Sequence, residues 1–190
     1  MSKPQRTDPL VIGWREWIGL PGLGIAAIKA KIDTGARTTA LHAVEIERRE
    51  HADGTQWLAF TVPAGNGHET LRVEAPMVEE REVKNTSGVP DPRPVIRTTL
   101  SLDRRRWPIE VTLADRTEMG FDVILGRTAI RRRRVLVNPG RSFLARPPLG
   151  FVPPAEVPGG VPGGADADDA GERDETLAAE EVEASAESGT

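Results

Sequence analysis

One aspartate in this chain stands where a carboxylate could act as an acid or a base on a bound substrate. Asp33 follows an alternating apolar run over residues 28–32, and Thr34 and Gly35 come directly after it. The alternation predicts a strand whose apolar residues share one face. Gly35 permits the tight turn that must follow, and the Thr34 hydroxyl can donate or accept a hydrogen bond beside the carboxylate. We therefore interpret Asp33 as half of a two-carboxylate acid–base site.

A second segment supports this interpretation. Far downstream, residues 121–130 form a short apolar run that ends in Gly126 and continues into helix-compatible residues. An Asp-Thr-Gly triplet alone recurs by chance, and its simpler interpretation is a turn aspartate that binds its own backbone. The apolar-apolar-Gly-Arg step that ends at Arg127, taken with the strand-rich pattern of the chain, favours a catalytic Asp33.

Together these two segments resemble the retropepsin-like aspartic peptidases. The string from Ala30 to Ala43 is similar to the bacterial branch labelled "ATP-dependent zinc protease", which is related to peptidases found beside ATP-grasp glutamate ligases. The resemblance covers about residues 10–148 and implies an all-β fold, a retropepsin-like closed β-barrel with one short helix. It also implies a set of residues that shape and support the catalytic turn, namely Thr34, Gly35, Ala36, Ile124, Leu125 and Gly126.

A single aspartate motif implies two chains. Hydrolysis by carboxylates needs one group to deprotonate water and another to protonate the substrate. Two adjacent aspartates share one proton, because both cannot ionise cheaply, and so they divide these roles. The chain holds one Asp-Thr-Gly and no Asp-Ser-Gly. We therefore predict a two-fold homodimer with Asp33 of each copy in the dyad. In the family the hydroxyl of the turn, here Thr34, interlocks the two turns.

The resemblance implies a peptide or protein substrate. Arginines near the site suggest an acidic one, and the relation to peptidases found beside glutamate ligases implies a glutamate-rich one. The resemblance places the loop Lys84–Pro94 where retropepsins carry the flap that closes over substrate; an ordinary surface loop is the alternative. The candidate substrate-binding residues come from this loop and from segments near the turn: Arg37, His42, Asn85, Gly88, Arg97 and Arg127. For His42, a structural histidine is the favoured interpretation.

Short runs of β-branched and aromatic residues, separated by turn signals, predict the strands that must position the site. The expected strands are residues 11–20, 25–32, 41–49, 56–62, 69–75, 78–83, 95–102, 107–113, 121–125 and 135–137. A hairpin is expected at Asp53-Gly54, and a short helical piece at residues 127–132. Strand 135–137 is expected to complete the barrel.

The 190-residue chain has a net charge of −4 that conceals two unlike parts. Residues 1–154 hold 24 basic and 18 acidic residues, whereas residues 155–190 hold one basic and 11 acidic residues. We expect a flexible N-terminus over residues 1–9, a peptidase domain over 10–148, and a Pro/Gly linker with a disordered acidic tail over 149–190. A solubilising tail is favoured over one that folds back as an inhibitor.

The sequence gives little support for a metal site, a cofactor site or a membrane segment. The chain has no cysteine, and His42, His51 and His68 are scattered without a His-Glu-x-x-His motif, so we predict no metal site. No phosphate-binding loop is present, and we predict no cofactor. Nothing resembles a signal peptide or a membrane span, so a cytoplasmic protein is expected.

Two other function classes stay open. The runs 104–106 and 131–134 are all arginine. Nucleic-acid binding through these runs is an alternative. Against it, the aromatic content is low and the sequence shows no known motif for recognising nucleic-acid single strands or grooves. A catalytically silent module of the same fold that recruits acidic partners is a further alternative.

Overall fold

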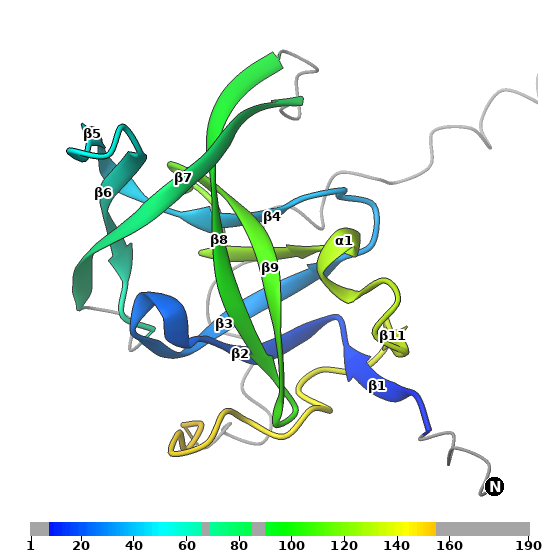
Figure 1. Cartoon of the computed structure of the whole chain (residues 1–190). Helices are drawn as coiled ribbons and strands as arrows, with labels where there is room; N and C mark the ends of the chain where they lie inside the picture. The colour runs from blue at the N-terminus through cyan, green and yellow to red at the C-terminus, as the bar shows by residue number, and fades with distance from the viewer. Residues whose placement is uncertain (1–7, 66–68, 85–89, 155–190) are drawn as a thin grey trace, which may run out of the picture. The chain divides into compact units, whose positions relative to one another are not determined.

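The computed structural model of the chain describes residues 8–65, 69–84 and 90–154. These residues form strands, one 3-10 turn and one short α-helix (Figure 1). In chain order the elements are β1 (Leu10–Gly13), β2 (Arg15–Leu20), η1 (Pro21–Leu23), β3 (Ile25–Asp33), β4 (Thr39–His42), β5 (Val44–Glu50), β6 (Gln56–Pro63), β7 (Thr70–Lys84), β8 (Pro90–Leu102), β9 (Arg105–Ala114), β10 (Val123–Gly126), α1 (Arg127–Ile130) and β11 (Val135–Asn138). The predicted all-β class is confirmed. No described helix is long and apolar enough to cross a membrane.

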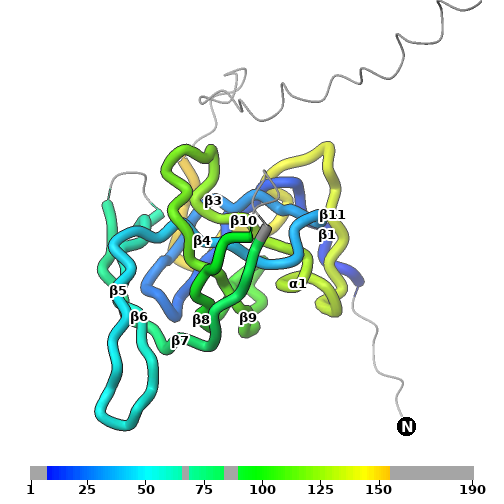
Figure 2. The backbone as a smooth tube through the Cα atoms, turned by 90° about the horizontal axis from the view of Figure 1, so that it is seen from above, coloured from blue at the N-terminus to red at the C-terminus, as the bar shows by residue number. Residues whose placement is uncertain are grey.

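The main sheet closes into a ring of strands. Its order is β2-β3-β10-β4-β9-β8-β7-β6-β5, and β2 also pairs with β8 at Gly19 and Ser101. A Cβ on Gly19 would lie 2.8 Å from the Ala26 carbonyl oxygen of β3 and 3.3 Å from the Ser101 Cβ of β8, so glycine lets β2 lie close to both strands. Strands β7, β6 and β5 continue beyond the ring, and the β5–β6 hairpin projects away from it (Figure 2).

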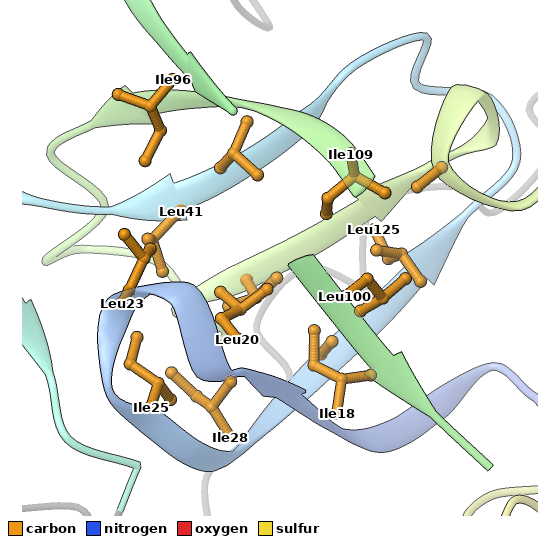
Figure 3. Close-up of a cluster of buried hydrophobic side chains, with 14 of the residues drawn as sticks. Ile18, Leu20, Leu23, Ile25, Ile28, Leu41, Ile96, Leu100, Ile109 and Leu125 are labelled. Carbon is orange, nitrogen blue, oxygen red and sulfur yellow. The ribbon is translucent and has the colours of Figure 1, made fainter. Parts of the chain in front are cut away.

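The core fills the interior of this ring (Figure 3). Ile28, Ala30 and Ile32 are all buried, as the alternation ahead of Asp33 predicts, while Lys29 on the same strand is exposed. The largest fully buried side chains come from many strands, which makes the core depend on every part of the ring; they include Ile18, Leu20, Ile25, Leu41, Phe60, Ile96, Leu100 and Leu113.

Strand β11 does not complete the ring, contrary to the prediction. It pairs in parallel with β1, from Leu10 opposite Val135 to Gly13 opposite Asn138, in a separate two-stranded sheet. The predicted strand 11–20 is interrupted at Trp14, whose backbone carbonyl accepts the Ile32 N–H at 2.7 Å and whose N–H donates to Arg141 at 2.8 Å. The first half of that segment therefore serves a different sheet from the second half.

The predicted strands 69–75 and 78–83 are one strand, β7. Pro76 pairs with Trp57 on β6, and the register shifts between Met77 and Glu79, where the partner changes from β6 to β8. The sequence suggests a break because Pro76 lacks an N–H. A bulge absorbs the irregularity instead, and the strand continues into the neighbouring pairing.

Residues 90–94 were predicted as part of a loop and belong to β8. Pro90, Pro92 and Pro94 lie opposite Lys84, Glu82 and Glu80 of β7. Pairing of β8 with β9 begins only at Val95. The alternating prolines therefore turn their missing N–H toward an edge that has no partner strand among the described residues, which is where a strand tolerates proline. The β7–β8 hairpin extends beyond the ring on the side of β4 (Figure 1).

Candidate active site

Asp33 ends β3 at the point where three strands meet. Its neighbour β10 runs parallel to β3 with Gly126 opposite Asp33, and antiparallel to β4 with Ile124 opposite Ala40. The chain therefore leaves β3 at Asp33, crosses the end of β10 and returns along β4. Asp33 itself is half-buried, whereas Thr34 is exposed. This crossing puts the half-buried carboxylate at the end of β3, beside the end of β10.

The turn after Asp33, residues 34–37, is held by the start of α1 (Figure 1). Four turn carbonyls accept hydrogen bonds from Arg127 and Thr128: Thr34 and Gly35 from the Arg127 guanidinium at 3.4 and 2.6 Å, Ala36 from the Arg127 N–H at 2.9 Å, and Arg37 from the Thr128 N–H and hydroxyl at 3.2 and 2.8 Å. Backbone N–H groups at a helix start have no partner within the helix. Here they bind the turn and make it rigid.

The Asp33 carboxylate is oriented by the same turn. Its Oδ1 accepts the Ala36 N–H at 2.8 Å. A Cβ on Gly35 would lie 3.2 Å from Oδ1, which is tight, so glycine suits the turn. Among the described residues no protein group donates to Oδ2. One oxygen is therefore held by the protein while the other is available to a water or a substrate.

Gly126 and two threonines hold β10 against the segment that leads from the turn into β4. The resemblance implies a supporting role for Gly126. A Cβ on Gly126 would lie 2.4 Å from the Thr38 carbonyl oxygen, so β10 and the chain entering β4 can touch only at a glycine. The Thr39 hydroxyl accepts the Gly126 N–H at 3.3 Å, and the Thr112 hydroxyl donates to the Thr39 carbonyl at 3.0 Å. Both threonines are buried. The sequence analysis missed them, although polar residues in apolar strands are a usable signal.

Arg37 is part of the turn after Asp33 and Arg127 binds that turn, whereas two other predicted residues lie apart from it. His42 lies at the far end of β4, about 10 Å along the strand from Thr39, and its Nδ1 accepts the Arg116 N–H at 2.9 Å. Arg97 lies on β8, 3.4 Å from a Glu110 carboxylate oxygen.

Substrate binding by the six candidate residues stays a prediction. Asn85 and Gly88, with the rest of 85–89, lie outside the described residues. The Arg127 guanidinium already donates hydrogen bonds to the Thr34 and Gly35 carbonyls of the turn.

The described residues offer no ligand set that fits the zinc of the branch label. No three His, Asp or Glu side chains among them lie close enough together to hold a metal ion. The chain has no cysteine to add. The Asp33 carboxylate accepts the Ala36 N–H, and it is not part of any such cluster among the described residues.

Arg127 is expected to position the turn. Replacing Arg127 with glutamine removes the two guanidinium bonds to the turn carbonyls. In an assay of peptide cleavage, the activity expected from the sequence, this change should lower kcat about 10-fold with little change in KM, because small displacements of a reacting group lower the rate strongly. Arg127→Lys should recover only part of kcat, since an ammonium cannot reproduce the planar fork. Arg104→Gln removes the same charge from an exposed site and is the control; an equal loss in both glutamine variants would contradict a positioning role.

Comparisons with known proteins agree with this geometry. A family model described as RimB-like, retropepsin-like aspartic endopeptidase RimB, matches residues 11–148. The chain is 45% identical over 135 residues to a "Probable alpha-L-glutamate ligase" of Parasynechococcus marenigrum (strain WH8102), covering 70% of this chain and 28% of that protein. It is 39% identical over 138 residues to a protein of the same name from Shewanella pealeana, covering 72% of this chain and 30% of that protein. The chain thus spans under a third of these relatives.

A solved structure shares the fold. The protein Lpg0085 of unknown function (DUF785) from Legionella pneumophila subsp. pneumophila str. Philadelphia 1 is 28% identical to this chain, with a TM-score of 0.62. The alignment covers 72% of this chain and 98% of that chain. The descriptions of the family model and of these relatives name neither zinc nor ATP.

Proposed function

This chain belongs to the RimB-like family of retropepsin-like aspartic endopeptidases, and we propose that it hydrolyses peptide bonds with a water activated by Asp33 and by Asp33 of a second copy. The observation that carries the proposal is the held turn: one carboxylate oxygen bound by the Ala36 N–H, and four turn carbonyls bound by Arg127 and Thr128. A preorganised carboxylate needs no rearrangement when charge develops on it.

The second copy follows from the chemistry. Acid–base hydrolysis needs a base and an acid at the same pH, and the chain holds one Asp-Thr-Gly motif. A two-fold interface through the turn would place the two Asp33 side chains face to face. Thr34 is exposed in the single chain and is available for such a contact.

In the proposed reaction the ionised Asp33 removes a proton from water, and the oxygen attacks the scissile carbonyl carbon. The protonated Asp33 of the other copy gives its proton to the carbonyl oxygen, so a neutral tetrahedral diol forms. The first Asp33 then gives its proton to the leaving nitrogen, while Asp33 of the other copy takes a proton back from one diol hydroxyl, so the C–N bond breaks and the carbonyl re-forms as a carboxylic acid. The dyad ends with one proton, as it began.

An acidic, glutamate-rich peptide is the proposed substrate class. The relatives that this chain matches are named as glutamate ligases, and a product rich in glutamate is a reasonable target for a domain of this kind. Residues 1–154 carry six more basic than acidic residues. Arg37 lies in the turn and is exposed, so it could receive a substrate carboxylate.

Subunit mixing tests the shared dyad. When wild-type chains are mixed and re-equilibrated with Asp33→Asn chains, only dimers of two wild-type chains should cleave peptide. Activity per wild-type chain should therefore fall to about half in an equal mixture and to about a tenth at nine parts variant. Asp53→Asn chains, changed in the β5–β6 hairpin, serve as the control: they keep Asp33, so activity per total chain should stay equal to that of the wild type in every mixture.

Activity per wild-type chain that stays constant as Asp33→Asn chains are added would contradict the dimeric dyad. The chain would then still be a peptidase, but one that needs no second Asp33. An absence of cleavage by wild-type chains on any peptide, with binding of acidic peptides retained, would favour the silent binding module of the same fold.

A further inference from the structure

A cavity of about 550 Å³ lies beside the segment that follows α1. Its walls come from β8 and β9 on one side and from residues 131–133 on the other. We call it the arginine pocket, after four residues that line it: Arg97, Arg131, Arg132 and Arg133. The last three were not among the predicted substrate-binding residues; the sequence suggested only nucleic acid as an alternative ligand for their run.

The charges of the arginine pocket are unbalanced. Arg131, Arg132 and Arg133 are exposed and form no ion pair with any carboxylate of the described residues. Glu110 also lines the pocket, but its carboxylate is already bound by Arg81 at 2.8 Å and by Arg97 at 3.4 Å. The hydrogen bond from Arg81 lowers the pKa of Glu110. The Glu110 carboxylate therefore stays ionised and bound to its two arginine partners. Three guanidinium groups are left without an anion.

The backbone that presents these arginines is unusual. Arg132 has a φ of 66°, in the left-handed region that non-glycine residues rarely occupy. The loop around it is held by two hydrogen bonds, from the Arg131 N–H to the Arg127 carbonyl at 2.9 Å and from the Arg133 N–H to the Ile130 carbonyl at 3.1 Å. Such strain persists where the surrounding structure enforces it, and it often accompanies a ligand site.

The wall of the pocket disfavours nucleic acid. Trp107 is only 6% exposed, its indole N–H donates to the Ala129 carbonyl at 2.8 Å, and the Arg133 guanidinium lies 5.6 Å from its ring centre. Binding of single-stranded nucleic acid relies on aromatic faces that stack on bases. This aromatic face is already covered, so the pocket offers charge without a stacking surface.

We propose that the arginine pocket is a second binding site, apart from Asp33, for side-chain carboxylates of an acidic peptide. Guanidinium groups bind carboxylates through paired hydrogen bonds, and the substrate class rests on the proposed function. The pocket adjoins the catalytic turn, since Thr128 lines the pocket and its hydroxyl binds the Arg37 carbonyl. The four residues of α1 span only about 6 Å. The pocket therefore lies beside the helix that holds the turn, and a peptide must span at least the length of α1 to occupy both sites.

Direct binding tests this site without requiring catalysis. Fluorescein-labelled oligoglutamate is titrated with the full chain carrying Asp33→Asn, and anisotropy gives Kd. Adding Arg131→Gln and Arg132→Gln should weaken binding about 10-fold. The same charge loss through Arg104→Gln in the β8–β9 turn and Arg106→Gln near the start of β9 should change Kd less than about two-fold. Arg131→Lys with Arg132→Lys keeps the charge but not the paired hydrogen bonds, and it should restore only part of the affinity. Added salt should weaken binding of the parent chain more than that of the pocket variant.

Equal effects of the two glutamine pairs would overturn the pocket as a specific site. Displacement of oligoglutamate by an oligouridine at lower concentration than by unlabelled oligoglutamate would also overturn it, in favour of nucleic acid. The proposed function fails separately, through an absence of cleavage by the wild-type chain. In that case a retained difference between the two pairs would still support the pocket.

Discussion

Asp33→Asn is expected to lower kcat/KM for peptide cleavage by about 10³- to 10⁴-fold, the size of effect that loss of a general acid–base group produces. Asparagine has the same shape as aspartate, and its amide oxygen can still accept the Ala36 N–H that the Asp33 Oδ1 accepts at 2.8 Å. The turn should therefore keep its structure. In the proposed dimer both carboxylates are lost at once, so neither the base nor the acid remains.

The measurement is cleavage of a mixed peptide library that includes oligoglutamate-tailed peptides, from pH 4 to 8, with and without EDTA. Wild-type cleavage should survive EDTA, because the proposed mechanism uses carboxylates and water alone. Asp53→Asn is the matched control. It carries the same chemical change on an exposed hairpin, and its activity should equal that of the wild type. Cleavage that survives Asp33→Asn, or that EDTA abolishes, would contradict the assignment of Asp33.

The second large effect concerns stability. Glu16 is only 1% exposed, and its carboxylate accepts backbone N–H groups from Gly13 at 2.6 Å, Leu144 at 2.8 Å and Ala145 at 3.2 Å. It thereby ties the segment after β11 to the bend between β1 and β2. Glu16→Ala leaves these three N–H groups without an acceptor and should lower the free energy of unfolding by about 3 kcal/mol or more.

The stability contribution of Glu16 should also depend on pH. Burial, with a smaller contribution from the charge of Asp103, raises the pKa of Glu16 above its usual 4.5, and the three backbone hydrogen bonds only partly oppose this. The folded protein therefore binds the proton more tightly than the unfolded chain does. The stabilisation is fully present below pH 4.5 and is lost as the pH rises through the folded-state pKa.

Glu16→Gln isolates this effect, because glutamine keeps an acceptor oxygen but cannot ionise. Urea unfolding from pH 4 to 8 should show the free energy of unfolding of the wild type, relative to Glu16→Gln, falling as pH rises. The comparison is needed because the Arg146 side chain lowers the pKa of Asp103, a shift whose stabilisation is lost as pH falls. Glu50→Ala on exposed β5 should change stability by less than about 0.5 kcal/mol. A difference between wild type and Glu16→Gln that is constant with pH would contradict the assignment.

Some features of the structure follow from short stretches of sequence. The alternation of Ile28, Ala30 and Ile32 is sufficient to orient β3, because side chains of a strand alternate between its two faces. The hairpin at Asp53-Gly54 formed as predicted between β5 and β6, with Gly54 at a φ of 79°. In each case the controlling interactions lie within a few residues of one another.

Other features were decided by distant partners. The prolines of β8 are tolerated because β9 does not reach that part of the strand, and no local rule contains that information. Pro76 likewise remains inside β7 because the strand changes partner beside it. Proline rules describe the loss of one N–H, but whether that N–H would have had an acceptor depends on which strand lies alongside.

The sequence by itself determined that Asp33 ends a strand, that a glycine turn follows, and that the chain resembles a retropepsin-like peptidase, because these depend on residue types at short spacing. Only the tertiary structure decided which groups hold that turn and which surround the arginine pocket. Arg127 reaches Gly35, and Thr112 reaches Thr39, across separations that no local pattern encodes. Contacts of this kind form only when the ring of strands closes, and closure depends on the summed packing of the whole core.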